Sequence, residues 1–224
     1  MNRNPDVNQE NAARAALVEA SRQSVAIGLN SGTAGNFSVR HGDGMLITPT
    51  GIAPAGLEPH QIVAVGLDGS WSGDWRPSSE WAIHARLYET TDARAVVHAH
   101  PDHCVALASL RRPIPPFHYM VAGFGGSEVP CADYACFGGP ELAETVVAAM
   151  GTTYSACLMA NHGVVTTGAD IATALGRAQK LETLARQYIL ACSVGQPVLL
   201  TTDELKDVRA RYRTYGQQDP KKAA

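Results

Sequence analysis

The sequence predicts an α/β fold, in which a single domain has a central mixed, largely antiparallel sheet covered by helices. Short strand-like segments alternate with helical segments along the chain, which is typical of a sheet with helices packed on it. The turn sequences Gly42-Asp43-Gly44 and Asp68-Gly69 close expected strands as hairpins and so favour antiparallel pairing. No G-x-G-x-x-G turn is present, which argues against a doubly wound dinucleotide-binding fold.

The first half of the chain is predicted to form a helix, a set of short strands and a second helix. Residues 8–29 carry apolar residues at helical spacing, and Gly28 helps to end that helix. Runs of apolar and β-branched residues between turn residues predict strands at 36–40, 45–48 and 62–67. A helix is expected over 78–90, directly behind Pro77.

The second half is predicted to begin with a buried strand over 95–100 and to continue with further helices and short strands. Pro101 suits the first turn of a helix over 102–110, and the prolines at 113, 115 and 116 predict an irregular connection. Extended segments are expected at 119–121 and 129–131. Apolar runs then predict a helix over 141–150, strands over 156–160 and 164–167, a long helix over 170–194 and a last helix over 203–215. A polar tail, mobile from about residue 213, completes the single domain of residues 1–224.

Composition excludes several classes of function. The formal net charge of -3 argues against nucleic acid as the main partner, because such proteins favour a basic face. No apolar run approaches the ~20 residues of a membrane span, and the polar N-terminus lacks a signal-peptide core. The five cysteines are odd in number and form no Cys-x-x-Cys pair, which predicts free thiols in a cytoplasmic protein.

Two histidines on one predicted strand are the strongest indication of chemistry. A strand has a side-chain period of two, so His98 and His100 are expected to point to the same face. A third candidate, His162, stands before Gly163 and beside another apolar run. Three neutral imidazoles leave open positions on a divalent metal, the pattern of a catalytic site. Two buried structural histidines are the alternative, which fits a lone histidine better than it fits this set.

Three loops with small side chains predict a site for a small anion. They are Ser31-Gly32-Thr33-Ala34-Gly35-Asn36, Thr48-Pro49-Thr50-Gly51 and Pro77-Ser78-Ser79-Glu80. Each offers hydroxyls and exposed backbone N–H groups, and backbone donors can bind a phosphate without lysine or arginine. Ordinary turns and a serine N-cap explain any one of these loops equally well.

Glu80 is open to two interpretations from the residues alone. In a helix that begins at Ser78 it lies at a position typical of a capping-box partner. Close to a metal site it is instead a candidate general base, and its neighbours Trp81 and Ile83 are expected to raise its pKa. His84 lies one turn later on the same helix face and is expected to be packed or paired.

Taken together, the motifs resemble those of the class II aldolase/adducin family over nearly the whole chain, from about Arg14 to Gly216. The segments that carry the resemblance are Thr33-Ala34-Gly35-Asn36, Leu46-Ile47-Thr48-Pro49-Thr50-Gly51, Pro77-Ser78-Ser79-Glu80-Trp81, Val97-His98-Ala99-His100, Ile114-Pro115 with His118-Tyr119-Met120, Cys131-Ala132-Asp133-Tyr134, His162-Gly163 and Thr214-Tyr215-Gly216. The resemblance implies a metal-dependent aldolase, which cleaves a ketose 1-phosphate such as L-fuculose 1-phosphate to dihydroxyacetone phosphate and an aldehyde.

The resemblance also implies roles for individual residues. It implies zinc bound by His98, His100 and His162, with Glu80 near the metal and acting as the base. Imidazoles also accept Mn²⁺, Co²⁺ or Fe²⁺. The substrate phosphate is then held by Thr33, Gly35, Asn36, Thr50, Gly51, Ser78 and Ser79. Tyr119 is the acid, offered to the site of a neighbouring subunit and assisted by Tyr215, in a homotetramer with its sites at subunit interfaces.

Other functions of the same family stay open at this point. One is an aldolase for 5-deoxyribulose 1-phosphate or 5-methylthioribulose 1-phosphate in salvage, because the bulky Phe124 is expected near the aldehyde end. Others are a dehydratase of methylthioribulose phosphate and a sugar-phosphate 4-epimerase, although epimerases of this type typically have Asp where this chain has Glu80. A non-enzymatic, adducin-like interaction module is disfavoured, because the histidines and Glu80 are retained.

Overall fold

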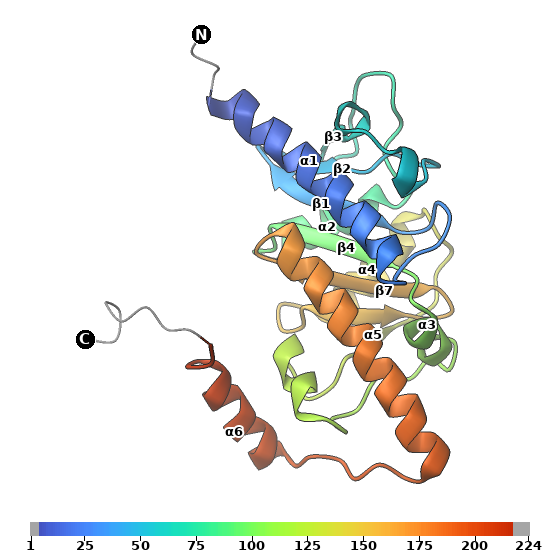
Figure 1. Cartoon of the computed structure of the whole chain (residues 1–224), viewed down its shortest axis with the longest axis vertical. Coiled ribbons are helices and arrows are strands. Elements are labelled where there is room, and N and C mark those ends of the chain that lie inside the picture. The colour runs from blue at the N-terminus through green and yellow to red at the C-terminus, as the bar shows by residue number, and fades with distance from the viewer. Residues whose placement is uncertain (1–4, 217–224) are drawn as a thin grey trace, which may run out of the picture.

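The computed structural model describes residues 5–216, which form an α/β fold with one mixed sheet (Figure 1). Its strands are β1 (Asn36–His41), β2 (Gly44–Ile47), β3 (Val63–Gly66), β4 (Ala95–Ala99), β5 (Cys131–Ala132), β6 (Ala156–Met159) and β7 (Gly163–Gly168). Its α-helices are α1 (Pro5–Ala26), α2 (Trp81–Thr90), α3 (Asp102–Ala108), α4 (Pro140–Met150), α5 (Ile171–Val194) and α6 (Thr202–Tyr212). Short 3-10 helices are η1 (Pro54–Gly56), η2 (Pro59–Gln61) and η3 (Tyr119–Phe124).

The sheet confirms the predicted mixed, largely antiparallel pairing. The seven strands lie in the order β3-β2-β1-β4-β7-β6-β5, and only β5 and β6 pair in parallel. The hairpins β1–β2 and β6–β7 are closed by short turns, as their glycines predict. The central strands β4 and β7 are buried along their whole length, as expected for strands with helices on both faces.

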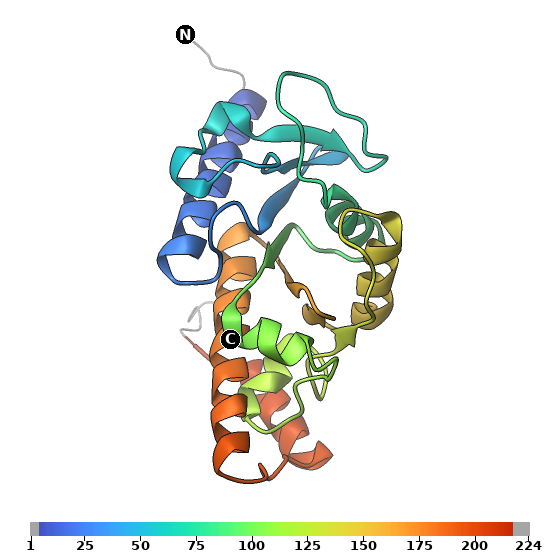
Figure 2. The ribbon, with the colours of Figure 1, turned by 90° about the vertical axis from the view of Figure 1, so that its right-hand side faces the viewer.

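Helices cover both faces of the sheet. Figure 1 shows α1 and α5 across the near face, and Figure 2, turned by 90°, shows them on one side of the sheet with α2 and α4 on the other. Two apolar cores result. Leu17 and Leu181 belong to the core under α1 and α5, whereas Ile83 and Leu142 belong to the core under α2 and α4. Helix α6 lies apart from these layers and packs against η3.

Strand direction decides which loops meet at the functional edge. Because β2, β1, β4 and β7 are successive antiparallel neighbours, the ends of β2 and β4 and the beginnings of β1 and β7 share one edge of the sheet. The pairing of Asn36 with His98 fixes the register of β1 on β4 at that edge. Two of the predicted anion loops and the predicted metal histidines lie at these strand ends, and the third loop, residues 77–80, joins them through the bridge between Pro49 and Pro77.

Several elements of the structure differ from the predicted ones in where they begin or in their type. Helix α2 begins at Trp81 instead of Ser78, because the Ser78 N–H donates to the Thr48 carbonyl in a bridge that keeps the chain extended. The segment 119–121 is the 3-10 helix η3 and not extended. The His118 side chain accepts the Met120 N–H and stabilises this turn.

Two further limits lie near the termini. Helix α1 ends at Ala26 instead of residue 29, and helix α6 ends at Tyr212 instead of Tyr215. The tail predicted to be mobile from about residue 213 falls largely on residues 217–224, which lie outside the described residues. Over residues 5–216, no helix combines the length and the apolar character needed to cross a membrane.

Candidate active site

His98, His100 and His162 form one cluster, as the sequence predicts. Their ligating nitrogens all lie within 4.8 Å of one another. His98 and His100 point to the same side, with 2.8 Å between their Nε2 atoms, which confirms the interpretation based on the strand period. His162 reaches them from the turn between β6 and β7, because β7 pairs with β4 at this edge.

Hydrogen bonding and burial prepare these imidazoles to act as ligands. The fully buried His98 ring faces the Val164 carbonyl oxygen with Nδ1 at 2.9 Å, so Nδ1–H donates and Nε2 keeps its lone pair. Burial, followed by the charges of His98 and His162, lowers the pKa of His100 to about 4. His100 is therefore neutral near pH 7, the form that binds a metal.

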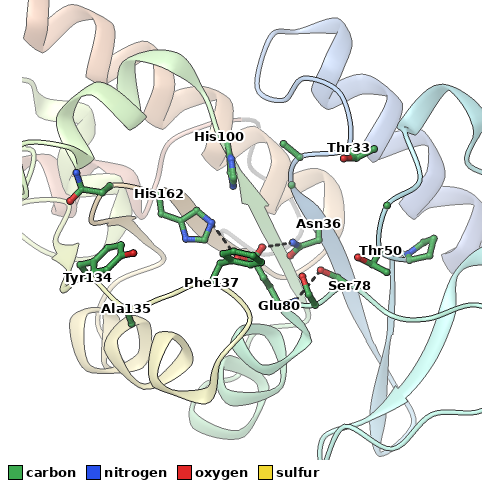
Figure 3. A pocket seen from close by; sticks show the side chains of 16 residues that line it. Thr33, Asn36, Thr50, Ser78, Glu80, His100, Tyr134, Ala135, Phe137 and His162 are labelled. Carbon is green, nitrogen blue, oxygen red and sulfur yellow. Dashed lines mark hydrogen bonds and ion pairs between the residues drawn. The ribbon is translucent and has the colours of Figure 1, made fainter.

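Glu80 stands against this cluster and is not a capping residue. It occupies the N-cap position of α2, makes no side-chain cap hydrogen bond, and aims its carboxylate at the histidines. Its Oε2 lies 3.2 Å from His98 Nε2. Its Oε1 lies 3.2 Å from His162 Nε2, a contact that Figure 3 shows. Among the described residues, Glu80 Oε1 is one of two buried side-chain oxygens without a hydrogen-bond partner. An orphaned buried carboxylate oxygen beside three imidazoles fits a site for a cation.

The pKa of Glu80 moves opposite to the expectation from its apolar neighbours. Burial raises it, but the charge of His98 and the close approach of His162 outweigh burial and hold the pKa well below its usual range. The carboxylate is therefore ionised at neutral pH, the state that suits a group facing a cation.

The cluster opens into a cavity of about 340 Å³. All three predicted anion loops border it. Thr33 and Gly35 come before β1, Thr50 and Gly51 follow β2, and Ser78 and Ser79 precede α2. Figure 3 shows Thr33 and Thr50 on one side of this cavity and His162 on the other. None of the lining residues, all within the described part of the chain, is lysine or arginine. An anion there would meet hydroxyls and backbone N–H groups.

Asn36 lines the same cavity, but its side chain is already engaged. Its Nδ2 donates to Glu80 Oε2 at 2.8 Å, and its Oδ1 lies 2.5 Å from His84 Nε2. Asn36 is only 5% exposed. The structure therefore connects Asn36 first to the carboxylate of Glu80 and not to the loops that surround an anion.

Comparison with known proteins agrees with this site. Residues 15–189 match the model of the family described as "Class II Aldolase and Adducin N-terminal domain". The chain belongs to the class II aldolase and adducin family.

Its similarity to individual members extends over almost the whole chain. It is 46% identical over 206 residues to the 5-methylthioribulose-1-phosphate/5-deoxyribulose-1-phosphate aldolase of Rhodospirillum rubrum, and the aligned part is 92% of this chain and 93% of the relative. It is 42% identical over 202 residues to an L-fuculose phosphate aldolase of Escherichia coli, with 89% and 94% covered. A solved structure of L-fuculose 1-phosphate aldolase superposes with a TM-score of 0.85 and 34% identity, over 90% of this chain and 96% of that one.

In this member of the class II aldolase and adducin family, Tyr119 and Tyr215 line one cavity, but neither lines the cavity at the histidine cluster of its own chain. Both line a second cavity of about 290 Å³, together with Tyr212 from α6. No residue of this second cavity borders the first. The arrangement is compatible with the prediction that Tyr119 serves a neighbouring subunit, and that prediction stays untested.

Some residues at the cavity were missed by sequence reasoning. Tyr134 and Phe137, from the segment between β5 and α4, line it, and so does Asn161. Tyr134 lies in one of the motifs that carry the family resemblance, which was the available signal. Phe124, expected near the aldehyde end, is instead 1% exposed in the core and does not line the cavity.

The close packing around Gly163 explains why a glycine follows the third histidine, and this packing can be tested directly. A Cβ at this position would lie 2.5 Å from the Ala99 carbonyl oxygen and 2.9 Å from His100 Cδ2. We expect Gly163→Ala to destabilise the protein by about 1–3 kcal/mol, because backbone and a packed ring must shift. Urea unfolding measures this change.

The matched control is Gly176→Ala inside α5, where an added Cβ meets no atom within 4 Å. This substitution should raise stability by about 0.5–1 kcal/mol, since alanine is the better helix former. Equal stability of Gly163→Ala and the wild-type protein would contradict the close packing of this turn on the histidines.

Proposed function

We propose that this protein is a metal-dependent aldolase, a carbon–carbon lyase that cleaves a ketose 1-phosphate to dihydroxyacetone phosphate and an aldehyde. The observation that carries the proposal is the single cavity that has His100, His162 and Glu80 of the histidine cluster on one side and anion-suited loops on the other. A ketose 1-phosphate has the matching arrangement, because its phosphate is one carbon away from the carbonyl at which charge develops.

We assign His98, His100 and His162 as the ligands of a divalent metal, with Glu80 beside it. Zinc is the proposed ion, because three imidazoles that leave a position open are typical of catalytic zinc, while Mn²⁺, Co²⁺ and Fe²⁺ suit the same donors. When bound, the metal supplies a Lewis acid at the carbonyl end of the substrate. The orphaned Glu80 Oε1 supports this assignment from within the structure.

Proton transfers are assigned to Glu80 and Tyr119. In the direction of synthesis, Glu80 removes a proton from C3 of dihydroxyacetone phosphate, the C3–C4 bond forms, and Tyr119 protonates the new alkoxide. In cleavage the same groups act in reverse. Tyr215 assists Tyr119, whose phenol is a stronger acid than the alcohol that is formed. No lysine lines the cavity in the described residues, so nothing there supports a Schiff base.

The phosphate is proposed to lie among Thr33, Gly35, Asn36, Thr50, Gly51, Ser78 and Ser79. The side chains of Thr33, Thr50 and Ser79 are exposed at the cavity, whereas Ser78 is buried and its Oγ accepts the Glu80 N–H at 3.2 Å. Binding the remote phosphate fixes the reacting carbons in place, which lowers the entropic barrier of the reaction.

The identity of the sugar has two main candidates within this proposal. One is L-fuculose 1-phosphate, and the other is 5-deoxyribulose or 5-methylthioribulose 1-phosphate. The 46% identity to an enzyme named for the latter pair favours the second candidate. Glu80 at the base position argues against a sugar-phosphate 4-epimerase, and the complete cluster argues against a non-catalytic, adducin-like module.

The protein is proposed to work as a cytoplasmic homotetramer with its sites at subunit interfaces. All five cysteines are free, in agreement with a reducing compartment. The separation of Tyr119 from the histidines within one chain supports a site completed by a second subunit.

The reaction is tested by offering these ketose 1-phosphates to the metal-loaded protein and detecting dihydroxyacetone phosphate with a coupled dehydrogenase. We expect release from at least one of them and much slower release from the unphosphorylated sugar, because phosphate binding contributes to the transition state. A C4 epimer formed without release of dihydroxyacetone phosphate would assign an epimerase. No reaction with any of them would refute the aldolase proposal.

The metal ligands are tested by elemental analysis and by the affinity for Zn²⁺. His98→Ala removes one of three ligands, and we expect affinity to fall by more than about 100-fold, since even outer-shell changes cost ~10–100-fold. Activity should fall with it. The control is His41→Ala, because His41 lies at the end of β1 and outside the cluster. A His98→Ala protein that binds metal as tightly as the wild type would remove this residue from the site.

Subunit sharing is tested by mixing two inactive variants. Glu80→Gln lacks the base and Tyr119→Phe lacks the acid, and each is expected to turn over at least ~100-fold more slowly. If neighbouring chains supply these groups to one site, randomly mixed tetramers should recover about a quarter of wild-type activity. In an equal mixture, half of the chains keep Glu80 and the other half keep Tyr119, so about one site in four has both groups intact. Mixed oligomers, verified by native mass spectrometry, that stay inactive would contradict the shared site.

A further inference from the structure

A row of buried polar side chains runs into the protein behind Glu80. Tyr88 Oη lies 2.7 Å from Ser38 Oγ, which lies 2.6 Å from His84 Nδ1. His84 Nε2 lies 2.5 Å from Asn36 Oδ1, and Asn36 Nδ2 donates to Glu80 Oε2 at 2.8 Å. All five residues are at most 7% exposed, and His84 and Ser38 are fully buried.

The row exists because two periodicities match. Asn36 and Ser38 are two residues apart on β1 and so share one face of the strand. Glu80, His84 and Tyr88 are four residues apart and share one face of α2 and its N-cap. Each β1 side chain therefore fits between two α2 side chains, with Asn36 between Glu80 and His84, and Ser38 between His84 and Tyr88.

Only one assignment of donors and acceptors satisfies every hydrogen bond in this row. An ionised Glu80 only accepts, so Asn36 must turn its amide nitrogen toward it and its oxygen toward His84. The His84 ring then donates from Nε2 and accepts at Nδ1. Ser38 donates to Nδ1, and Tyr88 donates to Ser38. All the donors point in the same direction, toward Glu80.

The state of His84 agrees with this order. Burial, followed by the charge of His98, lowers the pKa of His84 to about 3, against a smaller opposing effect of Glu80. The ring is therefore neutral near pH 7, with one donor and one acceptor nitrogen, as the row requires.

We propose that His84, supported by Ser38 and Tyr88, is a positioning residue that fixes the orientation of the Asn36 amide and, through it, the Glu80 carboxylate. The proposal rests on the proposed function in taking Glu80 as the base. An asparagine amide rotated by half a turn has almost the same shape, but it would set oxygen against the carboxylate. His84 prevents this rotation, since the rotated amide would also set its N–H₂ against the His84 N–H.

The consequence for chemistry is a carboxylate with two distinct oxygens. Asn36 holds Oε2, while Oε1 is left without a hydrogen bond and faces His162. The free oxygen is thus presented to the cavity in one orientation, which is the preorganisation that a general base needs.

The first test compares two substitutions of His84 in the metal-loaded oligomer. His84→Leu removes both ring nitrogens, and we expect kcat to fall by about 10–100-fold, the usual cost of losing such a supporting contact. Metal content should stay close to wild type, because His98, His100 and His162 are untouched, and kcat should fall by a larger factor than any rise in KM. His84→Gln can place an amide N–H near the Nε2 position and should recover most of kcat.

A stability control separates positioning from simple packing. Leu87 is fully buried on the same helix α2 but touches no member of the row through a hydrogen bond. Leu87→Ala should lower the urea midpoint at least as much as His84→Leu, with kcat within about twofold of wild type. If kcat follows the urea midpoint across these variants, or if His84→Gln recovers nothing, the positioning role is overturned.

A double-mutant cycle then asks whether His84 acts through Glu80. In the Glu80→Gln background, the carboxylate that His84 orients is gone, so His84→Leu should cause little further loss of kcat. Loss by the same factor in both backgrounds would show two independent effects and overturn the proposal.

A spectroscopic measurement keeps the inference separate from the proposed activity. Long-range ¹H–¹⁵N spectra of histidine-labelled protein should show His84 as the neutral Nε2–H tautomer at pH 7. A neutral Nδ1–H tautomer or a charged ring would overturn the row, whatever the enzyme does. If the wild-type protein cleaves no ketose phosphate, the proposed function fails, while this spectrum still decides the orientation of Asn36.

Discussion

Antiparallel pairing of β1, β4 and β7 is the constraint on which the site depends. It sets Asn36 opposite His98 and His98 opposite Val165, so three segments far apart in the chain meet at one edge of the sheet. The same pairing gives the Val164 carbonyl to His98 Nδ1 and so determines which nitrogen faces the cluster. The backbone ladder thus sets the position of the histidines and the tautomer of His98.

The parts of the site that the sequence could predict are those governed by local periodicity. The two-residue spacing of His98 and His100 predicts a shared face, and the structure brings their Nε2 atoms together. Turn glycines and short apolar runs predict a mostly antiparallel sheet, which the structure confirms. Gly163 is visible in the sequence, but the reason for it is not, because the atoms that a side chain there would meet belong to β4 and His100, far away along the chain.

The parts that could not be predicted depend on contacts between distant segments. From the sequence alone, Glu80 stays open between a capping residue and a base, because the pairing of Ser78 with Thr48, which delays the start of α2, cannot be seen in the local sequence. The direction of its pKa shift was wrong for the same reason, since neighbours in sequence were weighed without the histidines across the cavity. The sequence places Asn36 in an anion loop and predicts a packed or paired His84, but only the packing of α2 on β1 shows that they are hydrogen-bonded to each other.

The position of α6 apart from the layered body has a consequence for how such a protein can change over evolutionary time. The histidines and the anion loops are built on a sheet buried between helices, where a substitution disturbs two cores. The tyrosine cavity is lined in part by α6, which buries little beyond Leu205. Substitutions can accumulate on α6 without disturbing the sheet, so the cavity that we propose to serve the aldehyde can diverge while the proposed metal and phosphate ends stay fixed. Such modularity offers a physical reason why relatives of comparable identity carry the names of different sugar phosphates.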